Sequence, residues 1–186
     1  MASPPTADDP GGRSVFPRIV LPSDALVLLV GIAASGKSTF ARAHFAATEI
    51  LSSDQLRAMI ADDPGAQGAT EDAFDLLHRI LAMRLRRGRL TVVDATNVEG
   101  WARAELVAVA RRHRRPCVAI VLDLPLPILL ERNATRSGHR PPPAALRRQQ
   151  RWLSESFASL EDEGFVAIHR LRSADEIDAT RVERPA

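Results

Sequence analysis

Short apolar runs recur along the chain, separated by polar segments, and they predict the strands of a sheet. The five runs lie at residues 25–30, 50–52, 91–94, 117–122 and 166–168. The first contains no polar residue, which is typical of a strand covered on both faces. The pattern therefore predicts a sheet in the interior of the molecule.

Between these runs the apolar positions recur at helical spacing. Residues 39–45 follow the first run, and longer amphipathic segments lie at 71–87 and 99–112. The positions expected to face the core are Phe74, Leu77, Ile80, Leu81, Leu85, Trp101, Leu106 and Val109, although Trp101 and Trp152 fit exposed stacking positions as well as core ones. Strands that alternate with helices predict a three-layer α/β fold, in which helices cover both faces of a parallel sheet of about five strands. Ligands bind such sheets at the carboxyl ends of the strands.

Length and composition favour one domain. The chain has 186 residues, of which 45% are hydrophobic and 26% charged, enough for a sizeable core. Residues 1–14 are rich in Pro, Asp, Gly and Ser and are expected to form a disordered tail before a domain at 15–186. The single cysteine, Cys117, lies in an apolar run and is expected to be buried. Without a long apolar stretch or a secretory signal, we expect no membrane association and a cytoplasmic location.

Only one of the 25 basic residues is a lysine, Lys37, and it lies in a glycine-containing loop after the first predicted strand. The loop fits the phosphate-binding pattern known as Walker A, G-x-x-x-x-G-K-[ST]. Its backbone N–H groups would hold nucleotide phosphates, Lys37 would reach the β and γ oxygens, and Ser38 would ligate Mg²⁺. The residues predicted to bind ATP here are Gly31, Ala33, Ala34, Ser35, Gly36, Lys37, Ser38 and Thr39. The alternative, a Gly/Ser turn without a ligand, is disfavoured because an apolar strand precedes the loop and a helix follows it.

Asp54 and Arg57 follow the second predicted strand. Ser53 or Asp54 could cap the helix that begins there. Asp54 could also accept the proton of an attacking hydroxyl during phosphoryl transfer. Arg57 lies one turn later on the same helix face, where its planar guanidinium could bind a phosphate of the acceptor.

The third predicted strand ends in polar residues. Asp94 is a candidate for holding Mg²⁺ through a bound water, while Thr96 and Asn97 are candidates for binding substrate. An ordinary exit from the strand into the next helix would use the same residues, and the two roles are compatible.

A Gly- and Pro-containing segment near residue 138 carries arginines at four-residue spacing, namely Arg132, Arg136 and Arg140. A mobile lid whose arginines neutralise the triphosphate explains both the charge and the glycine and prolines. Arg132 and Arg136 are therefore predicted to contact ATP, with Arg132 assisting transfer. A plain charged loop is the alternative.

Three further groups of arginines, at residues 84–89, 111–115 and 147–151, have two interpretations. They can be solvated helix ends, where cations complement the helix dipole. They can also form a surface that attracts a polyanion.

Several of these segments resemble the kinase module of bacterial polynucleotide kinase-phosphatases. The segments are 19–22, 26–30, the Walker A loop, 50–57, 73–78, 90–98 and 131–133. The similarity runs from about residue 19 to residue 184. This chain departs from the family pattern in the loop interior, where the family more often has a second glycine, and a stiffer loop is expected here.

The resemblance implies ATP-dependent phosphorylation of the 5′-hydroxyl end of DNA or RNA, as in nucleic acid repair. It implies that Lys37 and Ser38 hold the ATP phosphates and Mg²⁺, that Asp54 is the general base, and that Arg57 binds a phosphate of the acceptor. Arg132 would be the lid arginine. The family carries phosphatase and often ligase modules on the same chain, so separate phosphatase or ligase partners are open here.

Two other functions compete with this hypothesis. A small-molecule P-loop kinase, acting on gluconate, shikimate or an antibiotic, would share Lys37, Ser38 and the lid. A nucleotide-dependent switch of the GTPase type would need a second lysine for its Asn-Lys-x-Asp guanine motif, and the chain has none.

Overall fold

The computed structural model describes residues 17–185, and the predicted disordered tail lies outside the described residues. A five-stranded sheet forms the centre, with strand order β3-β4-β2-β5-β6 and every pairing parallel. A separate pair, β1 and β7, is also parallel. The strands are β1 (Arg18–Val20), β2 (Leu26–Val30), β3 (Ile50–Ser52), β4 (Thr91–Asp94), β5 (Cys117–Leu122), β6 (Ala167–Leu171) and β7 (Arg181–Glu183).

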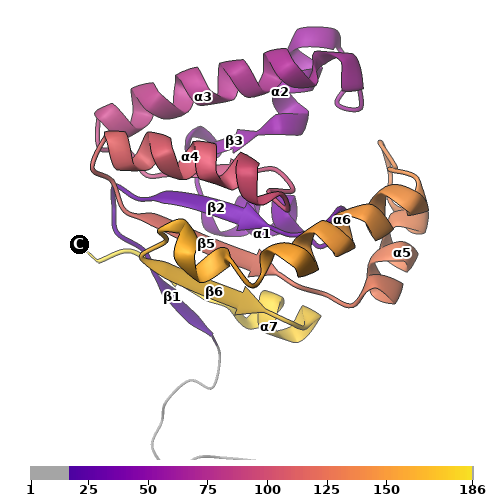
Figure 1. Ribbon diagram of the computed structural model, residues 1–186. Coiled ribbons are helices and arrows are strands. Elements are labelled where there is room, and N and C mark those ends of the chain that lie inside the picture. Colours follow the sequence, from indigo (N-terminus) through magenta and orange to yellow (C-terminus); the bar gives the residue numbers. More distant parts are fainter. Residues whose placement is uncertain (1–16, 186) are drawn as a thin grey trace, which may run out of the picture.

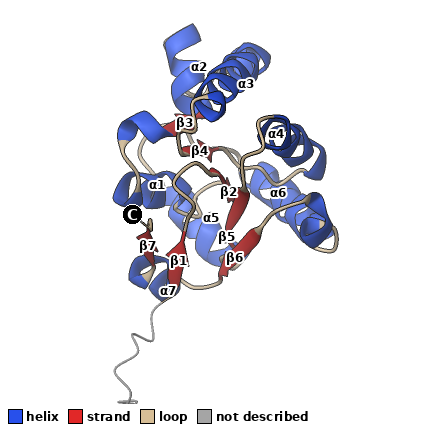
Figure 2. Ribbon diagram, turned by 90° about the vertical axis from the view of Figure 1, so that its left-hand side faces the viewer, coloured by secondary structure: helices blue, strands red, loops and turns tan. Residues whose placement is uncertain are grey.

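Seven α-helices and three 3₁₀ turns connect the strands in the described part of the chain (Figure 1). They are α1 (Lys37–His44), η1 (Ala47–Glu49), α2 (Ser53–Ala61), η2 (Gln67–Ala69), α3 (Thr70–Arg86), α4 (Gly100–Arg112), α5 (Leu126–Thr135), α6 (Pro143–Ser156), η3 (Leu160–Glu163) and α7 (Ala174–Ala179). Figure 2 shows the sheet between two layers, with α1 on one side and α4 and α6 on the other. The predicted three-layer α/β fold is confirmed.

The core forms where the predicted apolar runs meet. Every residue of β2, β4 and β5 is buried, as expected for parallel strands covered on both faces. Helix α3 packs Leu77, Leu81 and Leu85 into this core with no exposed surface. Cys117 is buried too, and burial raises the pKa of its thiol to about 12, so it behaves as a small apolar residue.

One predicted core position is wrong. Trp101 lies in the first turn of α4 and is 64% exposed, because a separation of five residues from the buried Leu106 turns it away from the buried face of the helix. The indole therefore faces solvent beside the carboxyl ends of the strands.

Two arginine groups lie at helix ends, as the first of the two interpretations predicts. Arg84 and Arg86 are in the last turn of α3, and Arg111 and Arg112 are in the last turn of α4. Arg84 donates to the carbonyl of Leu90 at 2.8 Å, immediately before β4 begins. These groups therefore lie at the amino ends of the strands, the edge of the sheet opposite to the expected ligand site.

A buried ion pair ties α4 to η3. Arg103 has no exposed surface, and its guanidinium donates from Nε and Nη2 to Glu163 at 2.7 and 2.5 Å. Its remaining nitrogen, Nη1, donates to the carbonyl of Asn97 at 2.8 Å, so it also fixes the loop between β4 and α4. This loop carries several of the predicted site residues.

Replacing Arg103 with alanine is expected to lower the free energy of unfolding by about 3–5 kcal/mol, because Glu163 would remain buried without its partner. The control is Arg18→Ala, which removes an ion pair with Glu183 whose side chains are 66% and 45% exposed, and it should cost no more than about 1 kcal/mol. Urea denaturation measures both. Equal losses in the free energy of unfolding would show that the buried pair contributes no more to stability than the exposed one.

Within residues 17–185, no helix is both long enough and apolar enough to cross a lipid bilayer.

Candidate active site

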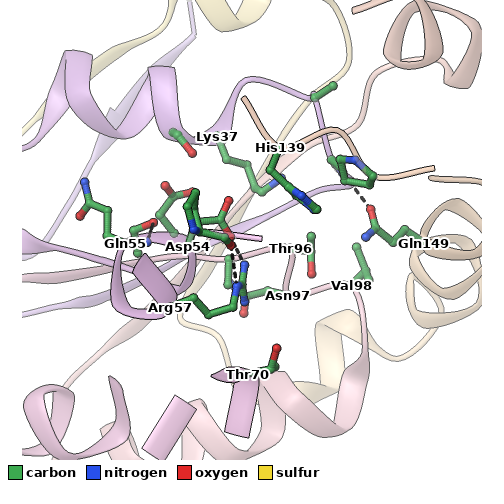
Figure 3. A pocket seen from close by; sticks show the side chains of 18 of the residues that line it. Lys37, Asp54, Gln55, Arg57, Thr70, Thr96, Asn97, Val98, His139 and Gln149 are labelled. Atoms are coloured by element: carbon green, nitrogen blue, oxygen red, sulfur yellow. Dashed lines mark hydrogen bonds and ion pairs between the residues drawn. The ribbon is translucent and has the colours of Figure 1, made fainter. Parts of the chain in front are cut away.

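A cleft of about 2020 Å³ opens at the carboxyl ends of β2, β3 and β4. The Walker A loop, the start of α2, the first half of α3, the β4–α4 loop, the lid segment and α6 all line it. Figure 3 shows Lys37 from α1, and Asp54 and Arg57 from α2, directed toward the same space. The cleft thus brings together side chains that are far apart in the sequence.

The Walker A loop has the conformation that its glycines permit. Gly36 has a φ of 98°, in the left-handed region, and caps α1. A side chain at Gly31 would not fit, because its Cβ would lie 2.7 Å from the carbonyl oxygen of Leu122. The amide of Gly31 donates to the carbonyl of Thr96 at 2.9 Å, which joins the loop to the end of β4.

The backbone of this loop is locally strained at Ala34. Its φ is 65°, a left-handed conformation that costs a residue with a Cβ about 1 kcal/mol. Strain of this kind persists where the surrounding structure determines the backbone, as at ligand sites. A second glycine at this position would remove the strain.

Lys37 is almost fully buried at the start of α1. Its Nζ donates to the carbonyl of Ile32 at 2.9 Å and to Oγ of Ser35 at 3.3 Å, so both hydrogen bonds of the ammonium lie within the Walker A loop. Burial lowers the pKa of Lys37 to about 8, and the nearby carboxylates of Asp94 and Asp54 oppose this effect. The amine therefore lies close to the boundary between its charged and neutral forms.

This pKa predicts a pH dependence for nucleotide binding. Phosphates bind the ammonium form, which the free protein loses as the pH rises through about 8, so binding above that pH requires proton uptake. The Kd for ATP is expected to rise by about tenfold per pH unit above 8. Calorimetry without acceptor measures it, and Lys37→Ala should show no inflection there. A constant Kd of the native protein between about pH 7 and 9.5 would contradict this role.

Asp94 and Ser38 form a pair beside Lys37. Burial raises the pKa of Asp94, while the neighbouring Ser38 hydroxyl and the Lys37 ammonium act in the opposite direction. A hydroxyl and a carboxylate are oxygen ligands suited to Mg²⁺, so the donor set fits the predicted metal. No cluster of three or more His, Cys, Asp or Glu side chains that could bind metal occurs among the described residues, and Mg²⁺ here would take its other ligands from water and phosphates.

Asp54 and Arg57 face each other across one turn of α2. Their carboxylate and guanidinium form an ion pair, which Figure 3 marks with dashed lines. Arg57 is held further by a 2.8 Å bond from its Nε to the carbonyl of Pro64, whereas the Asp54 side chain is 44% exposed. The helix cap is Ser52 and neither of the two alternatives, Ser53 and Asp54, since Oγ of Ser52 accepts from the amide of Gln55. The Asp54 carboxylate therefore does not cap the helix.

Thr96 and Asn97 line the cleft after β4. The Asn97 side chain is buried and donates from Nδ2 to the carbonyl of Leu29 at 2.8 Å, which bridges β4 and β2. Thr96 accepts the amide of Gly31 through its backbone. Both residues thus support the Walker A loop, and their contact with substrate stays a prediction.

The lid segment runs from the end of α5 to the start of α6. Arg132 and Arg136 line the cleft, and Arg136 is close enough to Lys37 to lower the pKa of the amine. Arg140 does not line the cleft and instead donates to the carbonyl of Arg136. Asn133 donates to the carbonyl of Pro141 at 2.9 Å, so the two ends of the segment are tied together.

The tip of the lid segment crosses the cleft to the α2–η2 connection. A Cβ placed on Gly65 would lie 2.5 Å from Nδ1 of His139, so the imidazole packs directly on that glycine. The lid segment thus contacts the α2–η2 connection at the rim of the cleft.

Sequence reasoning missed the contribution of α6. Oε1 of Gln149 accepts from the amide of Ala33 at 2.9 Å, so this helix holds the Walker A loop from a distance of 116 residues. Arg148 lies over the ring of Trp152, at 5.1 Å from its centroid, and both line the cleft. The apolar positions of Leu146 and Leu153, one helical face after three prolines, are the signal that could have revealed the helix.

The parallel sheet, the Walker A loop and the arginine-bearing lid together define a P-loop kinase. A protein-family profile described as an AAA domain matches residues 26–156, and the chain belongs to this family.

Three solved structures illustrate the likeness. A chain in the structure of the Pnkp1/Rnl/Hen1 RNA repair complex is 24% identical with a TM-score of 0.63, and the match covers 82% of this chain and 49% of that one. A gluconokinase from Sinorhizobium meliloti 1021 is 20% identical with a TM-score of 0.53, over 85% and 87% of the two chains. The APS kinase of Mycobacterium tuberculosis, in complex with AMPPNP and APS, is 19% identical with a TM-score of 0.51, over 85% and 93%.

These identities establish the fold alone, and the protein spans about half the length of the repair-complex chain. No curated protein matches the sequence.

Proposed function

We propose that this protein transfers the γ-phosphoryl of ATP to the 5′-hydroxyl end of DNA or RNA. The observation that carries the proposal is the pairing of Asp54 with Arg57 on the acceptor side of the cleft. A carboxylate can take the proton of a hydroxyl, and a guanidinium one turn away can bind the adjacent phosphate. A terminal nucleotide followed by a phosphodiester offers both groups at once.

The donor side would hold ATP. The Walker A amides and Lys37 would bind the β and γ phosphates, with Arg132 and Arg136 of the lid on the opposite side. Ser38, with Asp94 through a water, would hold Mg²⁺, which when bound neutralises charge on the phosphates. The APS kinase relative with bound AMPPNP supports ATP as the donor.

Asp54 would act on the acceptor. As the hydroxyl oxygen forms its bond to the γ phosphorus, the bond from that phosphorus to the bridging β–γ oxygen breaks, and ADP leaves. The proton of the hydroxyl passes to the Asp54 carboxylate. Lys37 and Arg132 would stabilise the charge on the transferring group, and the lid would exclude water that could otherwise accept the phosphoryl.

A small-molecule kinase is the second candidate, and the charge of the cleft wall favours it. The part of the cleft lined by α3 and the start of α4 carries Glu71, Asp75, Glu99 and Glu105. Four carboxylates suit a neutral or cationic acceptor better than a long polyanion. The gluconokinase relative is also a small-molecule kinase, although gluconate itself is an anion.

Partners for repair belong to the proposal as well. A chain that installs a 5′-phosphate prepares an end for joining, so separate phosphatase or ligase proteins are the partners that the chemistry suggests. The repair-complex relative is named as an assembly with Rnl and Hen1. Co-purification with chromosomally tagged protein tests this part.

Transfer of label from γ-labelled ATP tests the function. The acceptors are a 5′-OH DNA oligonucleotide, its RNA counterpart and gluconate, each with Mg²⁺. Label on an oligonucleotide supports the proposal and ranks the two nucleic acids. Label on gluconate alone, or no label despite ATP binding, would move the function to a small-molecule kinase.

Arg57→Ala is expected to raise the apparent KM for the oligonucleotide by about 10- to 150-fold, because an arginine–phosphate contact is worth about 1.5–3 kcal/mol. The KM for ATP should stay within about twofold. Arg57→Lys keeps the charge but loses the fork and should fall between the two. Equal changes in both KM values would contradict the assignment of Arg57 to the acceptor.

A further inference from the structure

The cleft contains an aromatic face without a partner in the described structure. Trp101 lines it from the first turn of α4 and is 64% exposed. Its Nε1 donates to Oε1 of Glu99 at 3.2 Å, which fixes the orientation of the ring with one contact at its edge. Burial of this indole in the core does not explain its presence here, because the residues that face the core from α4 are Arg103, Leu106, Val107 and Ala110.

The other tryptophan of the chain is different. Trp152 is partly buried against the core, and the guanidinium of Arg148 lies over its ring. Its face is therefore already covered by a cation. Among the tryptophans that line the cleft, only Trp101 presents an open face.

The charges around Trp101 argue against further phosphate contacts. Of the ionisable side chains that line the cleft from α3 and the start of α4, all but His78 are carboxylates. A nucleic acid backbone that followed this wall would meet repulsion beyond the phosphate bound by Arg57. Along this wall, affinity for the acceptor would come from another kind of contact, and base stacking on an aromatic face is independent of charge.

We propose that Trp101 is the stacking platform for one of the first two bases at the 5′ end of the acceptor. This inference rests on the proposed function, since it requires a polynucleotide in the cleft. On this proposal Trp101 helps to determine which acceptors are used. ATP does not contact Trp101. Stacking tolerates any base, so it selects for a nucleobase without selecting a sequence.

Fluorescence isolates the contact from catalysis. The chain has two tryptophans, so Trp152→Phe leaves Trp101 as the only indole. Titration of this variant with a 5′-OH oligonucleotide should quench the emission. An oligonucleotide of the same length with abasic sites at its first two positions should bind through Arg57 and quench far less. ATP alone should leave the emission of Trp101 nearly unchanged.

Kinetics supply the second readout. Trp101→Ala is expected to lower kcat/KM for the oligonucleotide by about 5- to 100-fold, while the KM for ATP stays unchanged. Trp101→Phe should recover most of the loss, because phenylalanine also stacks. For the abasic oligonucleotide, the native protein and Trp101→Ala should be equal. Thermal melting should show little change, since the side chain is exposed.

The outcomes separate this inference from the proposed function. If oligonucleotides accept label, but Trp101→Ala is as active as the native protein and the emission is not quenched, the stacking role is wrong and the kinase function stands. If no oligonucleotide accepts label, the proposed function fails and the stacking role with it. Quenching by the intact oligonucleotide, together with loss of activity in Trp101→Ala and recovery in Trp101→Phe, supports both.

Discussion

Replacing Asp54 with alanine is expected to lower kcat by about 100- to 10,000-fold while ATP binding changes little, because general base catalysis contributes a factor of this size. The ion pair of Asp54 with Arg57 holds the carboxylate in the cleft, and 44% exposure of the side chain leaves it reachable by an acceptor hydroxyl. Label transfer at saturating ATP and acceptor measures kcat directly. Asp54→Asn tests the proton transfer alone, because it retains the shape of the side chain.

The matched control for Asp54 is Asp75→Ala. Asp75 is an exposed carboxylate that lines the same cleft from α3, so its loss changes the local charge by the same amount. It should reduce kcat by no more than a few fold. If Asp54→Ala retained more than about a tenth of the native kcat, a loss under about 1.4 kcal/mol, Asp54 could not be the base.

Lys37→Ala is expected to reduce kcat/KM for ATP by about 100- to 1000-fold. The ammonium is the charge closest to where the β and γ phosphates would lie, and loss of one such donor in a water-excluded site costs about 100- to 1000-fold in other enzymes. The variant should fold normally, since the Nζ bonds that it loses lie within the loop itself. Label transfer over a range of ATP concentrations, with circular dichroism for the fold, checks both parts.

Arg42→Ala serves as the control for Lys37, because Arg42 is another cation that lines the cleft and comes from the same helix. Its removal should change kcat/KM for ATP by only a few fold. A Lys37→Ala protein with near-native ATP use would remove the Walker A assignment.

The sequence predicts the parts of the fold that obey a single strong pattern. Strand β2 is apolar throughout and is followed at once by a glycine-containing loop, so its burial and its neighbours follow from residues 25–38 alone. Strands β1 and β7 were not predicted. Each has three residues and a half-exposed pattern, which local periodicity does not distinguish from a loop.

The misassignment of Trp101 has a different cause. At 3.6 residues per turn, Trp101 lies about 140° around α4 from Leu106, on the side opposite to the buried residues of this helix. The helical period, applied strictly, therefore predicts that Trp101 is exposed, and the core assignment counted an i, i+5 pair as one face. The contact of Gln149 with the Ala33 amide is beyond local pattern, because it depends on how α6 packs after a lid segment.

The parallel ladder of β1 with β7 sets an order on folding during synthesis. Arg18 pairs with Glu183, at 2.6 Å and 165 positions away, so the ribosome must release nearly the whole described chain before that ladder can close. The segment that contains β2, β3, β4 and β5 leaves the ribosome much earlier, and those strands can already pair. The phosphate-binding loop can therefore pack against a partly formed sheet before β1 pairs with β7. Until then β1 presents an unpaired edge, whose short length limits wrong association with other chains.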